Sequence, residues 1–220
     1  MGIDLERPVV EVARDLLGRH VAHHATVVRL TEVEAYDGPG DPGSHARRGP
    51  TPRTQVMFGP SGHAYVYLSY GVHFLMNIVT GPVGHASAVL LRAGHEITPT
   101  GARGTDLRGP AAVARALGYT LADTGARVSL LEGSPADDAA VSTGPRVGLS
   151  DDDDGRPWRL WITGDPSVSS WRPGKASRAG KAGGAGGAGG ACSGGGGTAA
   201  QSSSAGPRGP NRTPGTGTRQ

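Results

Sequence analysis

Residues 25–36 read ATVVRLTEVEAY, and this run of β-branched and apolar side chains predicts a strand. Alternation along the strand places Glu32 and Glu34 on one face, and the apolar Val33 and Ala35 on the other. A glutamate at a strand end is usually solvated, whereas one placed in a pocket can act as a general base toward water. The pattern alone leaves both interpretations open for Glu34.

Short predicted elements surround this strand. Residues 9–17 carry apolar side chains at helical spacing with Gly18 as a C-terminal cap, and residues 110–117 predict a second helix. Residues 37–53 are rich in Gly, Pro and Asp, which predicts a long loop of the kind that is usually functional or disordered. Further strands are expected at 63–70, 72–79, 86–92, 126–132 and 158–163. Many strands with few helices favour a single α+β domain.

The end of the chain differs from the rest in composition. Of 38 glycines, 15 lie in residues 175–220, a segment without Ile, Leu, Val, Met or aromatic side chains. Such a segment cannot bury enough apolar surface to offset the entropy of ordering the chain. We therefore expect a domain at 1–174 and a disordered, basic tail rich in Gly, Ala and Ser at 175–220.

Charge divides the chain at the same place. The whole chain has 22 basic and 19 acidic residues, but the tail has six basic residues and no acidic one, so residues 1–174 have a net charge of −3. A flexible basic tail can attract nucleic acid by counterion release, and a solvated extension without a role is the alternative. Both lysines and the only cysteine, Cys192, lie in the tail. This excludes a disulfide framework, a cysteine-based zinc site and a cysteine nucleophile in the domain.

Other classes of protein are disfavoured by missing patterns. The first twenty residues lack the apolar core of a signal peptide, and no apolar run approaches the roughly 18 residues of a membrane span. We expect a cytoplasmic monomer with no membrane contact. The eight histidines show no metal-ligand spacing, and the glycines fit no nucleotide-binding loop. We therefore expect neither a metal nor a cofactor.

Half of the ten aromatic residues lie between Phe58 and Phe74. Tyr65 and Tyr67 share one face of a predicted strand. A cluster in the core is the common outcome, but each tyrosine hydroxyl needs a partner, and tyrosines beside an arginine-containing loop also suit a platform for stacking bases. His45 lies in that loop, where a lone histidine is most often simply exposed.

A resemblance to a known family rests on six blocks in order. They are VEAYDGPGDPGSHARRGPTPR (33–53), MFGPSGHAYVYLSYGVHFLMN (57–77), VLLRA (89–93), DLRGPAAVARALG (106–118), GPRVGL (144–149) and PWRLWITGDPSVS (157–169). Together they cover about 8–173 and resemble bacterial 3-methyladenine DNA glycosylases of the alkyladenine (methylpurine) type. The resemblance implies a curved, mostly antiparallel sheet with flanking helices. It also implies a nucleoid-associated enzyme that removes alkylated or deaminated purines from double-stranded DNA.

The resemblance gives the matching residues roles in catalysis and DNA binding. Glu34 would activate the attacking water, and Arg92 would help to hold that water and the neighbouring phosphate. Tyr70 would enter the duplex and fill the gap left by the flipped nucleotide, because an aromatic wedge compensates for lost stacking. Three loop arginines would bind phosphates without reading the base sequence. They are Arg47, Arg48 and Arg53.

The same resemblance outlines a base pocket. Tyr36, His45 and Tyr67 would stack on the base, and Asn77 would disfavour the exocyclic amino group of guanine. Hydrolysis without strand cleavage is expected, because nicking glycosylases form a Schiff base and residues 1–174 contain no lysine. Two alternatives stay open: a non-catalytic protein that binds damaged nucleic acid, and a small-molecule nucleosidase.

Overall fold

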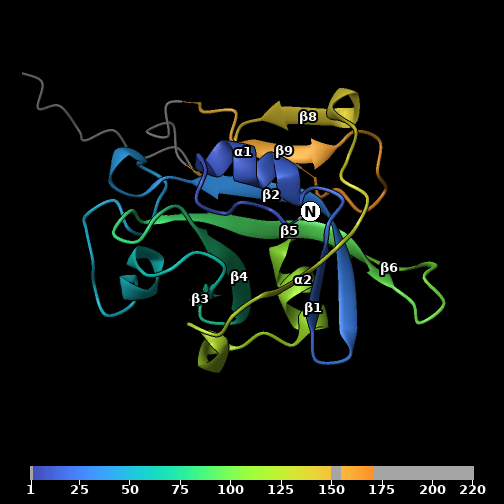
Figure 1. Ribbon diagram of the computed structural model, residues 1–220, viewed down its shortest axis with the longest axis horizontal. Coiled ribbons are helices and arrows are strands. Elements are labelled where there is room, and N and C mark those ends of the chain that lie inside the picture. Colours follow the sequence, from blue (N-terminus) through green and yellow to red (C-terminus); the bar gives the residue numbers. More distant parts are fainter. Residues whose placement is uncertain (1, 150–154, 171–220) are drawn as a thin grey trace, which may run out of the picture. The chain divides into compact units, whose positions relative to one another are not determined.

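Strand β2 (Thr26–Tyr36) forms where the β-branched run predicts it, and it is the strand around which the sheet is built (Figure 1). The computed structural model describes residues 2–149 and 155–170. The predicted tail at 175–220 and its boundary at 174 lie outside the described residues. All described residues fall within one compact unit, Met1–Ala179.

Every strand pair among the described residues is antiparallel. The main path of the sheet runs β3-β4-β5-β2-β1-β7, while β6 pairs with β5, and β9 pairs with both β2 and β8. The strands other than β2 are β1 (His20–His23), β3 (Ala64–Ser69), β4 (His73–Thr80), β5 (Ser87–Ile97), β6 (Arg103–Arg108), β7 (Ser129–Leu131), β8 (Val141–Gly144) and β9 (Arg159–Ile162). The expected α+β class with a curved antiparallel sheet is confirmed.

The sheet curls where β2 and β5 both change neighbours. On the edge that faces away from β5, strand β2 pairs first with β1 and then with β9. On the edge that faces away from β2, strand β5 pairs first with β4 and then with β6. Between these segments the ladder of β2 and β5 slips twice, leaving Thr31 and Arg92 without a partner in register. Bulges of this kind bend a strand and increase its twist. The curl therefore passes through the part of β2 that carries the two glutamates.

Two helices supply apolar faces to the main core. They are α1 (Val9–Leu16) and α2 (Pro110–Leu117), and neither is long and apolar enough to cross a membrane. Val12, Leu16 and Val113 are fully buried in the same cluster as the apolar side chains of the sheet. The predicted limits of α2 are confirmed, with Gly118 as its C-terminal cap at φ 77°, a value that favours glycine. Helix α1 ends one residue earlier than predicted and is capped by Leu17, because the Gly18 N–H donates to the Leu30 carbonyl of β2 and not to the helix.

Several elements go beyond the expectation. Strands β1, β6 and β8 lie in segments with no predicted strand, and β5 continues to Ile97 beyond the expected end at residue 92. The long loop at 37–53 contains one 3-10 turn, Gly38–Gly40. Three other 3-10 turns lie at Gln55–Phe58, Leu121–Asp123 and Asp138–Ala140.

Candidate active site

A cavity of about 470 Å³ lies on the face of the sheet opposite to the helix-packed core. Its sheet residues follow the period of two: Glu34 and Tyr36 on β2, Tyr65, Tyr67 and Ser69 on β3, His73, Leu75 and Asn77 on β4, and Ala88, Leu90 and Arg92 on β5. The intervening residues, such as Val33, Val66 and Leu91, lie in the core. The volume is in the range of small-molecule sites. Alternation therefore separates a binding face from a packing face.

Glu34 is the buried carboxylate of this cavity, with no exposed surface. Its Oε2 accepts a hydrogen bond from the Tyr36 hydroxyl at 2.8 Å, and its Oε1 accepts one from the Val147 backbone N–H at 2.7 Å. Arg92 Nη1 lies 3.2 Å from the same Oε1. A buried carboxylate with an arginine and two hydrogen-bond donors is satisfied without water, so it can be held in place inside an apolar cavity.

Arg92 bridges two glutamates of β2. Its Nη1 faces Glu34, and its Nε donates to Glu32 Oε1 at 2.8 Å. Burial alone would lower the pKa of Arg92, but the charges of Glu34 and Glu32 raise it above its ordinary value. The alternation of β2 correctly predicts that both glutamates lie on one face, since a single arginine side chain contacts both.

The aromatic wall of the cavity is formed by His45, Tyr65 and Tyr67. The His45 ring stands edge-on to Tyr67, with ring centroids 4.6 Å apart. The Tyr65 hydroxyl lies 2.9 Å from His45 Nδ1 and accepts a hydrogen bond from Arg53 Nε at 3.1 Å. Tyr65 thereby obtains the partner that a buried phenol needs and fastens the loop to β3.

The environment keeps these rings uncharged at neutral pH. Although His45 is partly exposed, desolvation of its ring in the cavity wall and the nearby charge of Arg53 lower its pKa to about 4. Burial, followed by the charge of Glu34, raises the pKa of Tyr67 to about 12 and that of Tyr36 well above its ordinary value. The walls thus present neutral faces and hydroxyl donors.

Asn77 and Tyr36 close two further sides of the cavity. Asn77 is nearly buried, and its Nδ2 donates to the Tyr65 carbonyl at 2.9 Å. In the sheet register it pairs with Leu90, which pairs with Glu34. The Tyr36 ring has the Arg146 guanidinium 4.5 Å from its centroid on one face.

Tyr70 lies at the tip of the β3–β4 hairpin, 96% exposed, at the rim of the cavity. Its φ is 50° and that of Gly71 is 72°, while the Val72 N–H donates to the Ser69 carbonyl at 3.1 Å. This is the pattern of a type I′ turn, in which Asn and Gly are the preferred residues. A tyrosine there is an uncommon choice that points a large ring away from the domain.

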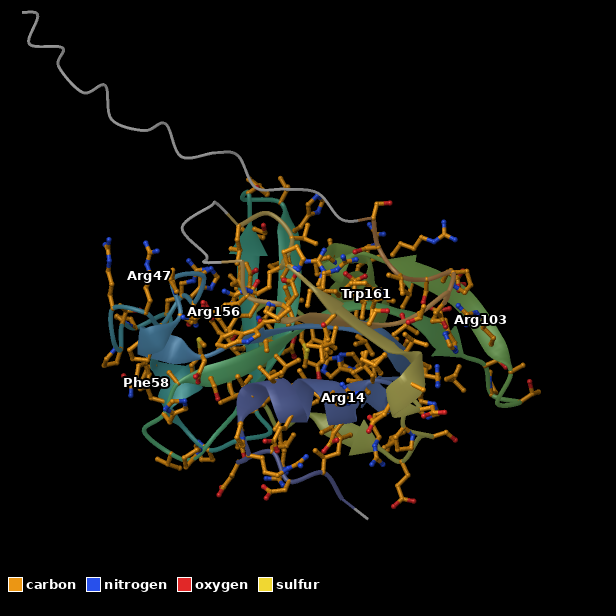
Figure 2. The ribbon with its side chains drawn as sticks, turned by 90° about the horizontal axis from the view of Figure 1, so that it is seen from above. Arg14, Arg47, Phe58, Arg103, Arg156 and Trp161 are labelled. Atoms are coloured by element: carbon orange, nitrogen blue, oxygen red, sulfur yellow. The ribbon has the colours of Figure 1, made fainter. Side chains whose placement is uncertain are left out.

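The three predicted phosphate-binding arginines do not share one environment. Arg47 and Arg48 are exposed, and Arg47 Nη1 donates to the Pro42 carbonyl at 2.9 Å. Figure 2 shows Arg47 on the loop at the left edge of the view, far from Arg103 on β6. Arg53 is also exposed, but its guanidinium lies against the aromatic wall, 5.3 Å from the centroid of Tyr67.

Two buried ion-pair groups at the site had not been expected from the sequence. Arg146 makes two 2.6 Å hydrogen bonds to Asp41, with both side chains fully buried, and donates to the Ala35 carbonyl at 2.9 Å. This pair fastens the 37–53 loop over the cavity. In the second group, Glu32 accepts hydrogen bonds from Arg159, Ser169 and Arg92. The contacts of Arg146 to Asp41 and of Arg159 and Ser169 to Glu32 join residues more than 100 positions apart, so a single sequence gives no signal for them.

The cavity therefore combines ring faces with a carboxylate beside an arginine. Such an arrangement can stack a flat heterocycle and bring a general base to a bond at its edge. In the described ranges, no three His, Cys, Asp or Glu side chains are grouped so that they could hold a metal ion.

Comparison with known proteins points in one direction. Residues 3–166 match the family described as Methylpurine-DNA glycosylase (MPG). A protein of Streptomyces avermitilis is 48% identical over 193 residues, covering 76% of this chain and 88% of its own length. Proteins of Frankia casuarinae and Cutibacterium acnes are 44% and 46% identical, covering 80% and 76% of this chain and 95% and 97% of their own lengths. All three carry the name "Putative 3-methyladenine DNA glycosylase".

Proposed function

Because this chain belongs to the methylpurine-DNA glycosylase family, we propose that it hydrolyses the N-glycosidic bond of damaged purines in duplex DNA. The observation that carries the proposal is the fully buried carboxylate of Glu34 beside Arg92 in an aromatic cavity. The substrates would be 3-methyladenine, 7-methylguanine, hypoxanthine and ethenoadenine, and the product an abasic site.

Base flipping follows from the depth of the catalytic groups. A stacked base cannot bring its glycosidic bond to a buried carboxylate, so the nucleotide must rotate out of the duplex at a cost of a few kcal/mol. Tyr70 is 96% exposed at the rim of the cavity, where its ring can fill the vacated position in the stack. Damaged or mispaired bases cost less to extrude, which supplies part of the selectivity.

The aromatic walls favour electron-poor purines. Tyr36, His45 and Tyr67 line the cavity, and their π faces attract positively charged or alkylated rings. With its pKa at about 4, His45 adds no positive charge that would repel such a base at neutral pH. Asn77 would stand against the base and disfavour the exocyclic amino group of guanine.

In the chemical step the bond between the sugar carbon and the purine nitrogen breaks, and its electron pair leaves with the purine. The sugar becomes oxocarbenium-like, and a water oxygen bonds to the same carbon while Glu34 accepts the proton of that water. The negative carboxylate also stabilises the positive sugar. Arg92 would hold the water and the neighbouring phosphate in line.

Strand cleavage is not expected to accompany this reaction. Glycosylases that nick the strand attack with an amine and form a Schiff base, and residues 1–174 contain no lysine. Arg47, Arg48 and Arg53 would position the duplex through its phosphates. They could not supply the attacking amine, because the guanidinium of arginine stays protonated.

The test uses two duplex oligonucleotides, one with a single hypoxanthine and one with a single ethenoadenine, incubated with the protein in a chelator. Abasic sites are revealed by hot alkali. We expect strand scission only after alkali, and a loss of about 100-fold or more in the excision rate of Glu34→Gln. Glu96→Gln, a change of a glutamate on β5 outside the cavity, is the matched control and is expected to excise like the wild type.

Three results would contradict the proposal in different ways. Tight binding of both lesions without any abasic site would identify a binder of damaged DNA in place of an enzyme. A nick that appears before alkali would refute the argument from the missing lysine. Faster release of base from a free nucleoside than from the duplex would favour a nucleosidase.

A further inference from the structure

We propose that Glu32 is a positioning residue for excision: it holds Arg92 in the orientation that faces Glu34, and the segment 165–169 fastens it there. The inference rests on the proposed glycosylase function. Glu32 has no exposed surface and does not line the cavity, so any effect it has on the reaction must pass through another side chain.

Four donors converge on the Glu32 carboxylate. Its Oε1 accepts hydrogen bonds from Arg92 Nε at 2.8 Å, Arg159 Nε at 2.7 Å and Ser169 Oγ at 2.8 Å. Its Oε2 accepts one from the Ser169 backbone N–H at 2.6 Å. A buried carboxylate is stable only when its charge is paired and its oxygens are hydrogen-bonded, and both conditions are met here.

These contacts fix which edge of Arg92 faces the cavity. The guanidinium presents Nε to Glu32, and its Nη2 donates to Ser169 Oγ at 3.3 Å. Only Nη1 is directed at Glu34, 3.2 Å from Oε1. Arg92 also lies at the bulge of β5, where its backbone has no register partner on β2. The pairing of the two strands therefore restrains this residue less than its neighbours, and the contact with Glu32 supplies the missing restraint on the side chain.

The charges in this cluster balance, which explains why Glu32 remains an anion. Burial would raise the pKa of Glu32, but the charge of Arg92 and the hydrogen bonds from Ser169, Arg159 and Arg92 lower it below its ordinary value. Two carboxylates, Glu32 and Glu34, thus face two guanidinium groups, Arg92 and Arg159. If Glu32 lost its charge, Arg92 would be drawn toward Glu34, the remaining anion within reach.

The consequence for the reaction is specific to the chemical step. A guanidinium that turns its bidentate edge toward Glu34 would occupy the carboxylate oxygens needed to accept the proton of water. A misplacement of about 1 Å can cost roughly 100-fold in rate. We expect Glu32→Gln to lower the single-turnover excision rate about 10- to 100-fold while the affinity for the lesion duplex stays within about twofold.

The experiment measures both quantities on a hypoxanthine duplex, for the full chain, in the wild type, Glu32→Gln, Arg92→Met and the double variant. If Glu32 acts through Arg92, the double variant should excise less than about twofold more slowly than Arg92→Met alone, because the side chain through which Glu32 acts is already missing. Glu96→Gln is the matched control, because it makes the same chemical change at a glutamate of β5 that lies outside the cavity and is not among the residues that contact Glu32 or Arg92. It is expected to excise like the wild type.

A second variant keeps the test decisive if Glu32→Gln does not fold. Ser169→Ala removes the hydroxyl that touches both Glu32 and Arg92 but leaves all four charges in place, and it should lower the excision rate a few-fold without changing affinity. An unchanged rate in Glu32→Gln, an equal loss in Glu96→Gln, or independent losses in the double variant would each overturn the positioning role. A wild type that releases no base would overturn the proposed function, and this inference with it.

Discussion

At the residue scale, the cavity obtains its properties from side chains whose ordinary ionisation has been suppressed. Burial and Arg53 lower the pKa of His45 to about 4, and burial raises the pKa of Tyr67 to about 12. Both shifts favour the uncharged form of the ring. A site for a cationic or electron-poor base gains from this, since the walls attract it through their π faces and do not repel it by charge.

The shift at His45 predicts a pH dependence of stability. Between pH 6.5 and 4 the unfolded chain binds a proton at this histidine and the folded chain does not, so the free energy of unfolding falls as the pH falls through this window. His45→Gln should remove that part of the loss and flatten the curve between these pH values. Urea unfolding at pH 7, 6, 5 and 4.5 measures the difference, and parallel curves for the two proteins would contradict it.

A second residue-scale prediction concerns Tyr70, which occupies a left-handed position at φ 50°. Such a conformation costs a non-glycine residue about 1 kcal/mol, and Asn tolerates it better. Tyr70→Asn should therefore raise the free energy of unfolding by about 1 kcal/mol and lower excision from duplex DNA about tenfold, because a stacked ring is worth about 1–3 kcal/mol. Tyr70→Phe is the control and should change neither. A destabilised Tyr70→Asn would show that the turn carries no strain.

At the element scale, the helices and strands that could be predicted are those whose ends are marked by glycine or proline. The limits of α2 were predictable because Pro110 opens the helix and Gly118 closes it. Strand β5 was predicted too short because Gly94 follows Ala93, although in the sheet Gly94 pairs with Leu30 and β5 continues. Strands such as β6, RGTDLR, and β8, VSTG, are short and polar, so they gain order from their neighbours and not from their own composition.

The ion pair that holds the 37–53 loop leads to a prediction at this scale. Burial would raise the pKa of Asp41, but the hydrogen bonds and charge of Arg146 lower it, so the carboxylate is an anion held by its partner. Arg146→Met should cost about 3–5 kcal/mol in unfolding free energy, because it leaves a buried charge without its partner. Adding Asp41→Asn should recover part of this loss. Urea unfolding measures both variants, and equal or larger loss in the double variant would contradict the explanation.

The same pair gives an internal check through pH. In Arg146→Met the buried Asp41 lacks its cation, so protonation removes an unpaired charge and the deficit relative to the wild type should shrink as the pH is lowered from 7 to 4.5. A deficit that stays constant as the pH is lowered would show that the loss comes from packing against Tyr36 and Trp158, because packing is not linked to protonation.

At the scale of the whole molecule, the candidate site joins segments that are far apart in the sequence. The strand carrying Glu34, the loop with His45 and the aromatic hairpin could be predicted from composition, spacing and resemblance. The partners that hold them could not, because Arg146, Arg159 and Ser169 follow more than 100 residues after the groups they bind. An arginine or a serine carries no local signal of such a partner. Long-range pairing is therefore the part of the site that required the structure.

The division of charge gives the last prediction. Residues 1–174 have a net charge of −3, whereas residues 175–220 add six basic side chains and no acidic one. The loop arginines that we propose to contact phosphate lie in a domain of net negative charge, and the tail supplies the excess of positive charge. A chain ending at residue 174 should bind undamaged duplex more weakly at low salt. Its plot of log affinity against log salt should be shallower by about 0.9 for each phosphate that the tail neutralises in the full chain.

The excision step should not change with this truncation, because Glu34, Arg92 and their partners all lie before residue 174. Single-turnover excision at saturating protein therefore serves as the control for correct folding of the shortened chain. Fluorescence anisotropy between roughly 25 and 200 mM salt, a range over which screening of the charges strengthens, measures the slope. Equal slopes for the two chains would assign all phosphate binding to the domain and leave the tail as a solvated extension. A shallower slope with an unchanged excision rate would separate attraction to DNA, supplied by the tail, from chemistry, supplied by the sheet.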